Sequence, residues 1–145
     1  MKATIKHGAS GDAVKIAQYL LGCAEMGKAT GEYDAGTVAA VCAWQRVNGL
    51  TPDGIIGPKS WTKMAEKAPT CSTKKNKKSA ATCALQIALG GLTADGIFGS
   101  KTKAAVAAFQ AANGLQADGI AGTKTWAALI TGEVVTAAKF AQPVD

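Results

Sequence analysis

The chain repeats itself, and this repeat constrains its fold more than any other feature of the sequence. Residues 31–61 align with residues 96–126 at an offset of 65 residues without a gap, and 16 of these 31 positions are identical. Upstream, Gln18 and Leu21 align with Gln86 and Leu89 at an offset of 68 residues, so the first copy carries three extra residues near residues 23–30. Because self-similarity at a fixed offset indicates repeated structural units, the sequence predicts two homologous modules.

The segment between the two copies differs from both in composition. Residues 69–78 are polar, contain one proline and hold four lysines, Lys74, Lys75, Lys77 and Lys78. Polar, proline-containing and charged stretches between periodic segments are typical of exposed linkers. We therefore expect module 1 over residues 1–68, a basic linker over residues 69–78, and module 2 over residues 79–132. Residues 133–145 match nothing in the first copy and are expected to form a C-terminal appendage.

Each copy carries the signals of three helices. In the first copy, Val14, Ala17 and Leu21 recur at helical spacing, which predicts a helix over residues 12–22. A second helix is expected over residues 37–48, with Gly49 as its left-handed C-terminal residue. A third begins at Pro58, because proline is favoured at the first helical position. The alanine-rich composition also favours helix. The predicted fold class is all-α, with two tandem three-helix bundle modules.

The motif Asp-Gly-Ile-x-Gly before the third helix is interpreted as a turn. The Asp53 side chain can accept hydrogen bonds from amides two residues on, Gly54 permits positive φ, and Ile55 is expected to fill the core. A calcium-binding EF-hand loop would need several acids in alternation, and each loop here offers one. With one histidine and no Cys-x-x-Cys pair, a zinc site is not expected either. We predict no metal and no cofactor.

The charge and the polar residues limit the function. The formal net charge of +6 indicates an acidic partner. Hydrolases of the zinc type need several histidines, and His7 is the single histidine. Glycoside hydrolysis needs two carboxylates, one in an apolar pocket, whereas the repeated acids are explained by turns. Nucleic-acid recognition needs a helix presenting basic or amide side chains, but residues 103–112 carry a lysine only at their start. We therefore expect no catalysis and no nucleic-acid binding.

The sequence also bears on the location of the chain and on its cysteines. No run approaches the roughly 18 apolar residues of a membrane span, and residues 1–7 lack the apolar core of a signal peptide. Membrane binding is therefore not expected. The four cysteines, Cys23, Cys42, Cys71 and Cys83, are either free thiols or disulfide-bonded in one of three pairings. The sequence does not choose between these.

The motifs together resemble a known family, the peptidoglycan-binding domain 1 family. The second copy carries its pattern as Leu85-Gln86, Asp95-Gly96, Phe109-Gln110, Asn113-Gly114-Leu115, Asp118-Gly119 and Thr125-Trp126. The first copy departs from it where Glu32-Tyr33-Asp34 replaces Asp-Gly-Ile. The resemblance implies three-helix modules that usually accompany wall-lytic enzymes of bacteria or phages. It therefore implies a monomer that binds bacterial peptidoglycan without cleaving it. The chain would be secreted, wall-associated, or phage-encoded and released at lysis. The alternative is a structural or adaptor protein that uses the same helices for protein contacts.

The resemblance also suggests a shallow groove beside the second and third helices of each module. Sugars and short acidic peptides need amide and hydroxyl groups beside an apolar floor. The candidate ligand-binding residues are Phe98, Gln110 and Asn113 in the second copy and Tyr33, Gln45 and Asn48 in the first. In the alternative interpretation, Gln110 and Asn113 bond the backbone and Phe98 belongs to the core. The lysine run is interpreted either as a solvated flexible tether or as a contact with anionic wall polymers such as teichoic acids.

Overall fold

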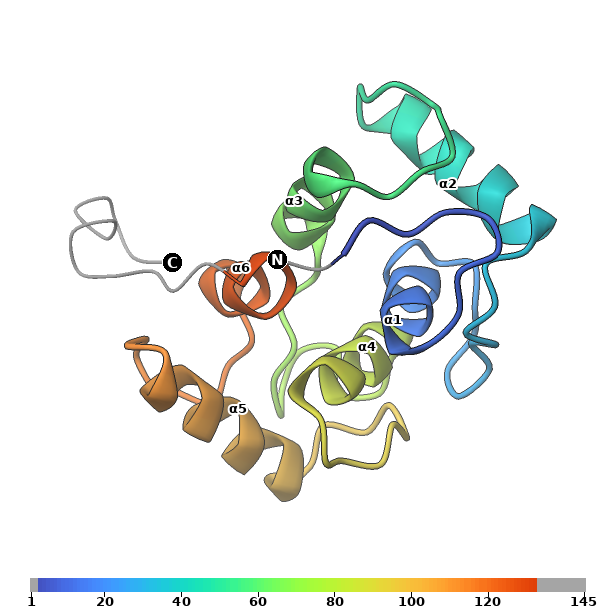
Figure 1. Ribbon diagram of the computed structural model, residues 1–145. Coiled ribbons are helices and arrows are strands. Elements are labelled where there is room, and N and C mark those ends of the chain that lie inside the picture. The colour runs from blue at the N-terminus through green and yellow to red at the C-terminus, as the bar shows by residue number, and fades with distance from the viewer. Residues whose placement is uncertain (1–2, 133–145) are drawn as a thin grey trace.

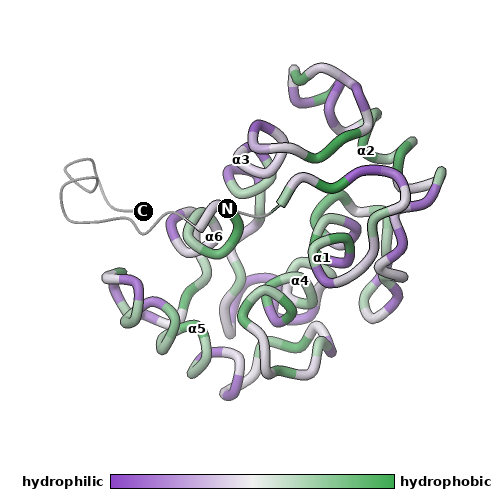
Figure 2. Tube along the Cα trace, in the orientation of Figure 1, coloured by the Kyte–Doolittle hydropathy of each residue, from purple (hydrophilic) through white to green (hydrophobic). Residues whose placement is uncertain are grey.

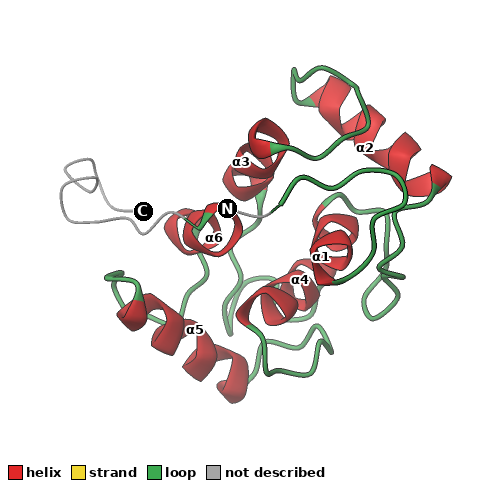
Figure 3. Ribbon diagram, in the orientation of Figure 1, coloured by secondary structure: helices red, strands yellow, loops and turns green. Residues whose placement is uncertain are grey.

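The computed structural model describes residues 3–132, and its regular structure is helical (Figures 1 and 3). The helices are α1 (Asp12–Leu20), α2 (Ala35–Val47), α3 (Pro58–Lys67), α4 (Ala80–Leu89), α5 (Ser100–Ala112) and α6 (Thr123–Thr131). Within the described residues, β-type pairing is limited to isolated bridges between loop segments. This arrangement confirms the all-α fold of two three-helix modules. The predicted appendage over residues 133–145 lies outside the described residues.

The helix boundaries follow from local sequence chemistry. α3 begins at Pro58, as predicted. α4 begins after Ser79, whose hydroxyl accepts a hydrogen bond from the Thr82 amide at 3.1 Å. α2 begins two residues earlier than predicted, because the Asp34 carboxylate caps it by accepting from the Thr37 amide at 2.9 Å. A capping side chain satisfies one of the amides left unpaired at a helix start, so Asp34 determines this boundary.

The two modules pack directly against each other, and equivalent helices meet. α1 lies against α4, and α3 lies against α6, in the middle of the molecule (Figure 1). α2 and α5, also equivalent to each other, lie at opposite sides of the molecule. An interface in which each element contacts its own counterpart has the isologous character of a two-fold dimer. The chain is therefore built like a symmetric dimer within one polypeptide.

The burial pattern of α1 and α4 reflects this central position. In α4 the five successive residues from Thr82 to Gln86 are buried, and in α1 the residues from Ile16 to Tyr19 are buried together with Val14. Successive buried positions cover all sides of a helix, and a helix buried all round lies inside a core rather than on a surface. Figure 2 shows that most of α4 is hydrophobic. The two modules therefore share one hydrophobic core.

The extra residues of the first loop of module 1 contribute to the contact between modules. Met26 of this loop reaches the first loop of module 2 at Gly96, where an added Cβ would lie 3.1 Å from the Met26 sulfur. The same Cβ would lie 3.0 Å from the Cys83 sulfur and from the Ser79 carbonyl oxygen. Gly96 also has φ +77, which disfavours other residues. This close approach requires glycine and ties the loop of one module to the other.

The predicted exposed linker is in fact paired along its main chain with module 2. Cys71 and Ala121 exchange two backbone hydrogen bonds of 3.1 and 2.9 Å, and the Lys77 carbonyl accepts from the Phe98 amide at 2.6 Å. Cys71 is fully buried. Composition predicts the exposure of the lysine side chains, which are exposed, but it does not show the pairing of the backbone that carries them. The predicted limits of the two modules stay predictions.

Module 1 contains a counterpart of the segment of residues 69–78. The backbone pair of Ile5 and Ile56 is the counterpart of the pair of Cys71 and Ala121. The indole N–H of Trp61 donates to the Ala3 carbonyl at 3.0 Å, and the indole N–H of Trp126 donates to the Pro69 carbonyl at 2.9 Å. Buried tryptophans usually need such a partner. Residues 69–78 are therefore the leading segment of module 2, as residues 3–10 are of module 1.

Candidate ligand-binding site

Four buried glutamines hold the loops that precede α2, α3, α5 and α6. They are Gln18, Gln45, Gln86 and Gln110, each between 1 and 5% exposed. Each side-chain amide bonds the loop that follows its helix and the first turn of the next helix. Buried polar groups need hydrogen-bond partners. A buried glutamine at this position therefore requires the loop conformation that supplies its partners, and the loop in turn depends on the glutamine. We call each of these arrangements a glutamine clamp.

The clamp of Gln110 shows the pattern in full. Its Nε2 lies 3.0 Å from Asp118 Oδ1, 2.9 Å from the Ile120 carbonyl oxygen and 2.9 Å from Thr125 Oγ1. Its Oε1 accepts from the Gly119 amide at 3.0 Å. The loop of residues 118–120 and the start of α6 are thus fixed by one side chain.

The other clamps repeat these contacts. Gln45 and Gln86 bond the equivalent groups of their own loops at distances between 2.9 and 3.1 Å. Gln18 does the same, but the Thr30 hydroxyl takes the place of the aspartate carboxylate. The first loop of module 1, which departs from the family pattern in sequence, therefore keeps the clamp geometry. This clamp was missed in the sequence, although each glutamine precedes a Gly-x-x-x-x-x-Thr or Gly-x-x-x-x-x-Ser spacing that could have indicated it.

The loop aspartates are stabilised as carboxylates by these contacts. The Ile55 amide, and then the Gln45 side chain, lower the pKa of Asp53 below its ordinary value. The Ile97 amide and the Gln86 side chain lower the pKa of Asp95 in the same way. Hydrogen bonds donated to a carboxylate favour its charged form. These acids are turn elements, as predicted, and their lowered pKa suits them poorly to act as proton donors.

The structure places the predicted ligand-binding residues in the following way. Phe98 and Tyr33 are 3 and 2% exposed and belong to the core. The Tyr33 hydroxyl donates to the Gly54 carbonyl, and burial raises its pKa to about 12. Gln45 and Gln110 are the clamps described above. These contacts are those of the alternative interpretation, in which the side chains stabilise the fold.

Asn48 and Asn113 remain half-buried at the ends of α2 and α5. Their side-chain amides donate to the carbonyls of Trp44 and Phe109, four residues earlier, at 2.9 and 2.8 Å. They therefore help to end their helices before Gly49 and Gly114, which both have φ 71 as predicted. The ligand-binding role of the six predicted side chains stays a prediction.

The loop isoleucines point outward, which for Ile55 is contrary to the prediction. Ile55 is 37% exposed, and its neighbour Ile56 is the buried residue of the pair. The counterparts of Ile55 in the other loops, Ile97 and Ile120, are 53 and 43% exposed. The expectation that Ile55 fills the core was wrong because the chain turns at Gly54, with φ +74, and directs the next side chain to solvent. A large apolar side chain is thus presented at the same position of three loops.

A groove lies beside Ile55, along the start of α3. One depression of about 470 Å³ is lined by Ile55, Asp53, Leu50, Pro58 and Lys59, among others. A second, of about 330 Å³, shares Leu50, Pro58 and Lys59 and continues over the surface of α3. We call the two together the α3 groove. Its position, beside the second and third helices and the loop between them, is where the family resemblance suggested a ligand-binding groove.

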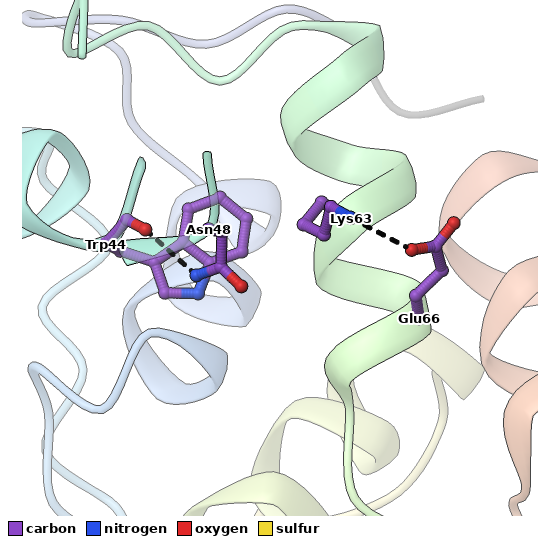
Figure 4. Close-up of polar contacts among 4 residues, drawn as sticks. All are labelled: Trp44, Asn48, Lys63 and Glu66. Atoms are coloured by element: carbon purple, nitrogen blue, oxygen red, sulfur yellow. Dashed lines mark hydrogen bonds and ion pairs between the residues drawn. The ribbon is translucent and has the colours of Figure 1, made fainter. Parts of the chain in front are cut away.

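Charged side chains border the far part of the α3 groove. Lys63 and Glu66 line it and form an ion pair of 3.4 Å. In the view of Figure 4, Lys63 lies between Glu66 and the end of α2 that carries Trp44 and Asn48. An exposed pair of this kind stabilises the fold by less than about 1 kcal/mol, so both groups can exchange partners readily. The groove therefore combines an apolar floor with groups of both charges.

The remaining features of the described chain concern metal binding, the cysteines and membrane spans. Within residues 3–132, no group of three or more His, Cys, Asp or Glu side chains is placed to hold a metal ion. The four cysteines, all within that range, are free thiols, of which Cys71 and Cys83 are buried. Burial raises the pKa of Cys71 to about 11, which makes its thiolate scarce at neutral pH. None of the helices α1–α6 is long and apolar enough to cross a membrane.

Comparison with known proteins matches this architecture to one class of module. The model of the family described as "putative peptidoglycan binding domain" matches residues 10–64 and 83–129. These two segments cover most of the chain, one in each module, and the chain therefore belongs to this family of binding domains. The chain is also 50% identical over 58 residues to a protein of Kitasatospora aureofaciens described as "uncharacterized protein in bpoA1 3'region". That match covers 38% of this chain and 49% of the relative, so the chain spans about half the length of the relative it matches.

Proposed function

We propose that this protein binds bacterial peptidoglycan without cleaving it, as the targeting part of a bacterial or phage wall-lytic system. The observation that carries the proposal is the match of both modules to a peptidoglycan-binding family. The supporting geometry is the α3 groove, whose apolar floor beside charged rims suits a ligand of sugars and short acidic peptides. The wall is then the place where the protein acts, outside the cytoplasm of the target cell.

The exposed isoleucines support a binding role for the loops. Folding does not require an apolar side chain on a turn to point toward solvent. Single exposed apolar residues are nevertheless common and need no explanation. Here, however, three of the four large apolar side chains that are exposed within residues 3–132 occupy the same position of the repeated motif. Ile55 also lines the α3 groove. We infer that Ile55 in module 1 and Ile120 in module 2 are equivalent ligand contacts.

The glutamine clamps support the same proposal from an energetic side. Gln45 fixes Asp53 and the Ile55 carbonyl before any ligand arrives. A loop already held in its bound conformation loses little further entropy on binding. The predicted residues Gln45 and Gln110 would then act by positioning the loop, and Ile55 and Ile120 by contact.

The experiment is a pull-down with purified, insoluble peptidoglycan. Replacing Ile55 with Ser should weaken binding by about fivefold, corresponding to about 1 kcal/mol of lost apolar contact. Ile120→Ser should act similarly, and the double variant should lose more than either. Val47→Ser is the matched control, because Val47 is an apolar residue that is 85% exposed and does not line the groove. Equal retention of the double variant and the control would refute the assignment of the site.

The same pull-down separates this function from an adaptor role. A wild-type chain that does not sediment with peptidoglycan would refute wall binding and leave protein contacts as the use of the exposed isoleucines. Variants of the whole chain are better suited than separated halves. Cutting between the modules exposes the central faces of α1 and α4, which are buried in the intact chain, so a separated half would differ in more than its number of sites.

A further inference from the structure

Four exposed lysines stand on one turn of the leading segment of module 2. They are Lys74, Lys75, Lys77 and Lys78. Module 1 makes the equivalent connection between the paired residues Ile5 and Ser10, whereas module 2 makes it between Cys71 and Lys78, with two more residues. The module 1 connection contains one lysine, Lys6. The fold therefore forms without the extra length and the extra charge, and these additions need another explanation.

Hydrogen bonds hold this lysine turn, residues 72–78, in one conformation. The Ser72 hydroxyl accepts from the amides of Lys74 and Lys75 at 3.1 and 3.0 Å, and the Ser72 amide donates to the Lys75 carbonyl at 2.8 Å. The Asn76 side chain donates to the Thr70 carbonyl at 2.7 Å. The segment is thus an ordered turn rather than a flexible tether.

Asn76 is the central residue of the turn. Among residues 3–132 it is the one residue other than glycine with a positive φ, at 51°. Asparagine tolerates this left-handed conformation better than most residues. The Asn76 carbonyl accepts hydrogen bonds from the Ser79 hydroxyl at 2.9 Å and from the Thr82 hydroxyl at 2.6 Å. The turn is therefore anchored to the first residues of α4, inside the rigid part of module 2.

The lysines of this turn have no acidic partner in the described part of the chain. The ion pair recorded there joins Lys63 and Glu66, which lie on α3. Ammonium groups crowded on a short fixed turn repel one another, and this repulsion is relieved when a chain of negative charges lies along them. Because the backbone is already ordered, such binding requires ordering of the lysine side chains alone.

We propose that the lysine turn is a binding site for a phosphodiester polymer of the cell wall, separate from the α3 groove. The inference rests on the proposed function, which brings the protein to a wall where such polymers accompany peptidoglycan. A polymer with regularly spaced phosphates contacts several lysines at once and releases its counterions, as any polyanion does. The turn recognises the charge and the spacing of the phosphates, whereas the α3 groove binds peptidoglycan.

Nucleic acid is the other polyanion of similar charge, and the structure favours it less. The turn is not a helix that could enter a major groove. The described aromatic side chains available for base stacking are buried or half-buried in the core, and none belongs to residues 72–78. Duplex DNA therefore serves as a competing probe.

The test compares two triple variants of the full chain with equal net charge. The turn variant replaces Lys74, Lys75 and Lys77 with Gln. The matched control replaces three exposed cations of module 1, Lys6, Lys28 and Arg46, with Gln. Each variant lowers the formal net charge of +6 by three units. The probes are soluble poly(glycerol phosphate), peptidoglycan stripped of attached polymers, and duplex DNA.

The expected results separate this site from the groove. Wild-type affinity for poly(glycerol phosphate) should fall about 20-fold between about 50 and 200 mM salt, for roughly three neutralised phosphates at the slope of a single-stranded polyanion. The turn variant should bind this polymer about tenfold more weakly than wild type at low salt, with the control within about twofold. Both should bind stripped peptidoglycan as wild type does.

Three results would overturn the proposal. An equal loss in both variants would show that only net charge matters. A wild-type chain that ignores poly(glycerol phosphate) would exclude the polymer site. Turn-dependent binding of duplex DNA that exceeds binding of the polymer would assign the turn to nucleic acid. Failure on stripped peptidoglycan alone would instead refute the proposed function of the groove.

Discussion

Replacing Gln110 with Leu tests whether the clamp holds the loop before α6. Leucine has a similar size, but it can bond neither the loop nor the helix. The Gly119 amide, which is buried, loses its acceptor Oε1 at 3.0 Å, and a buried unpaired amide costs about 1–3 kcal/mol. The bonds to Asp118, to the Ile120 carbonyl and to the Thr125 hydroxyl are also lost. Asp118 and Ile120 are exposed, so water compensates in part and the net loss is about 0.5–1 kcal/mol for each of their bonds. The Thr125 hydroxyl is buried, and the loss of its bond costs about 0.5–1.5 kcal/mol.

The net effect on stability can then be worked out. Leucine recovers about 1 kcal/mol through apolar burial, so we expect the free energy of unfolding to fall by about 2–5 kcal/mol. For a chain of this length the melting temperature should drop by roughly 6–20 °C. Urea unfolding followed by far-ultraviolet circular dichroism measures the change. The control is Gln116→Leu, an exposed glutamine of the same module, which should change stability by less than about 0.5 kcal/mol.

Two results for Gln110→Leu would refute the reasoning in different ways. If stability equals that of the control, the clamp does not hold the loop. If stability is unchanged but peptidoglycan binding is lost, Gln110 contacts the ligand directly, as the sequence-based prediction has it. The expected outcome is reduced stability, with binding weakened only as far as the loop has loosened.

Three further predictions concern acid stability, the contact between modules and the absence of lysis. Because the folded state lowers the pKa of Asp53 and Asp95, their contribution is present above the unfolded pKa and is lost as pH falls below about 4; urea midpoints measured against pH should fall there, less steeply after Asp→Asn replacement of both. Gly96→Ala should destabilise the chain by about 1–3 kcal/mol more than Gly114→Ala. Both glycines have positive φ, but only at Gly96 would a Cβ meet Cys83 at 3.0 Å, so equal urea midpoints would contradict the packing. The turbidity of a wall suspension should stay constant with the protein, and a steady fall that one acidic substitution abolishes would contradict the non-catalytic function.

The helices could be predicted from sequence because their signals are local. Pro58 marks the start of α3, Ser79 marks the start of α4, and Gly49 follows the end of α2. The contact of α1 with α4 could not be predicted, because nearly every side of α4 is apolar and its periodicity then indicates no preferred face. The backbone pairing of the predicted linker could not be predicted either, because the partner of Cys71, Ala121, is some fifty residues distant in sequence.

The site was predicted less well than the fold. The repeat places Gln110 and Phe98 at conspicuous motif positions, but a motif does not tell whether a side chain points inward or outward. The two adjacent isoleucines, Ile55 and Ile56, show the difficulty. Both residues are isoleucines, so residue type does not distinguish them. The left-handed turn at Gly54 decides that Ile56 is buried and Ile55 is exposed. A groove does lie beside the second and third helices, and of the six predicted residues Gln45 is among those that line it. Its use as a ligand-binding site stays a prediction.

The meeting of α1 with α4 and of α3 with α6 means that one module presents a face complementary to its own copy. A single ancestral module with such a face would pair with a second molecule only above a certain concentration. Joining two copies in one chain removes that dependence, because the partner is always attached. The converse follows for a chain divided before Pro69. We expect its two parts, expressed together, to associate as a split protein. The apolar contact between equivalent helices would then hold the parts together without the peptide bond.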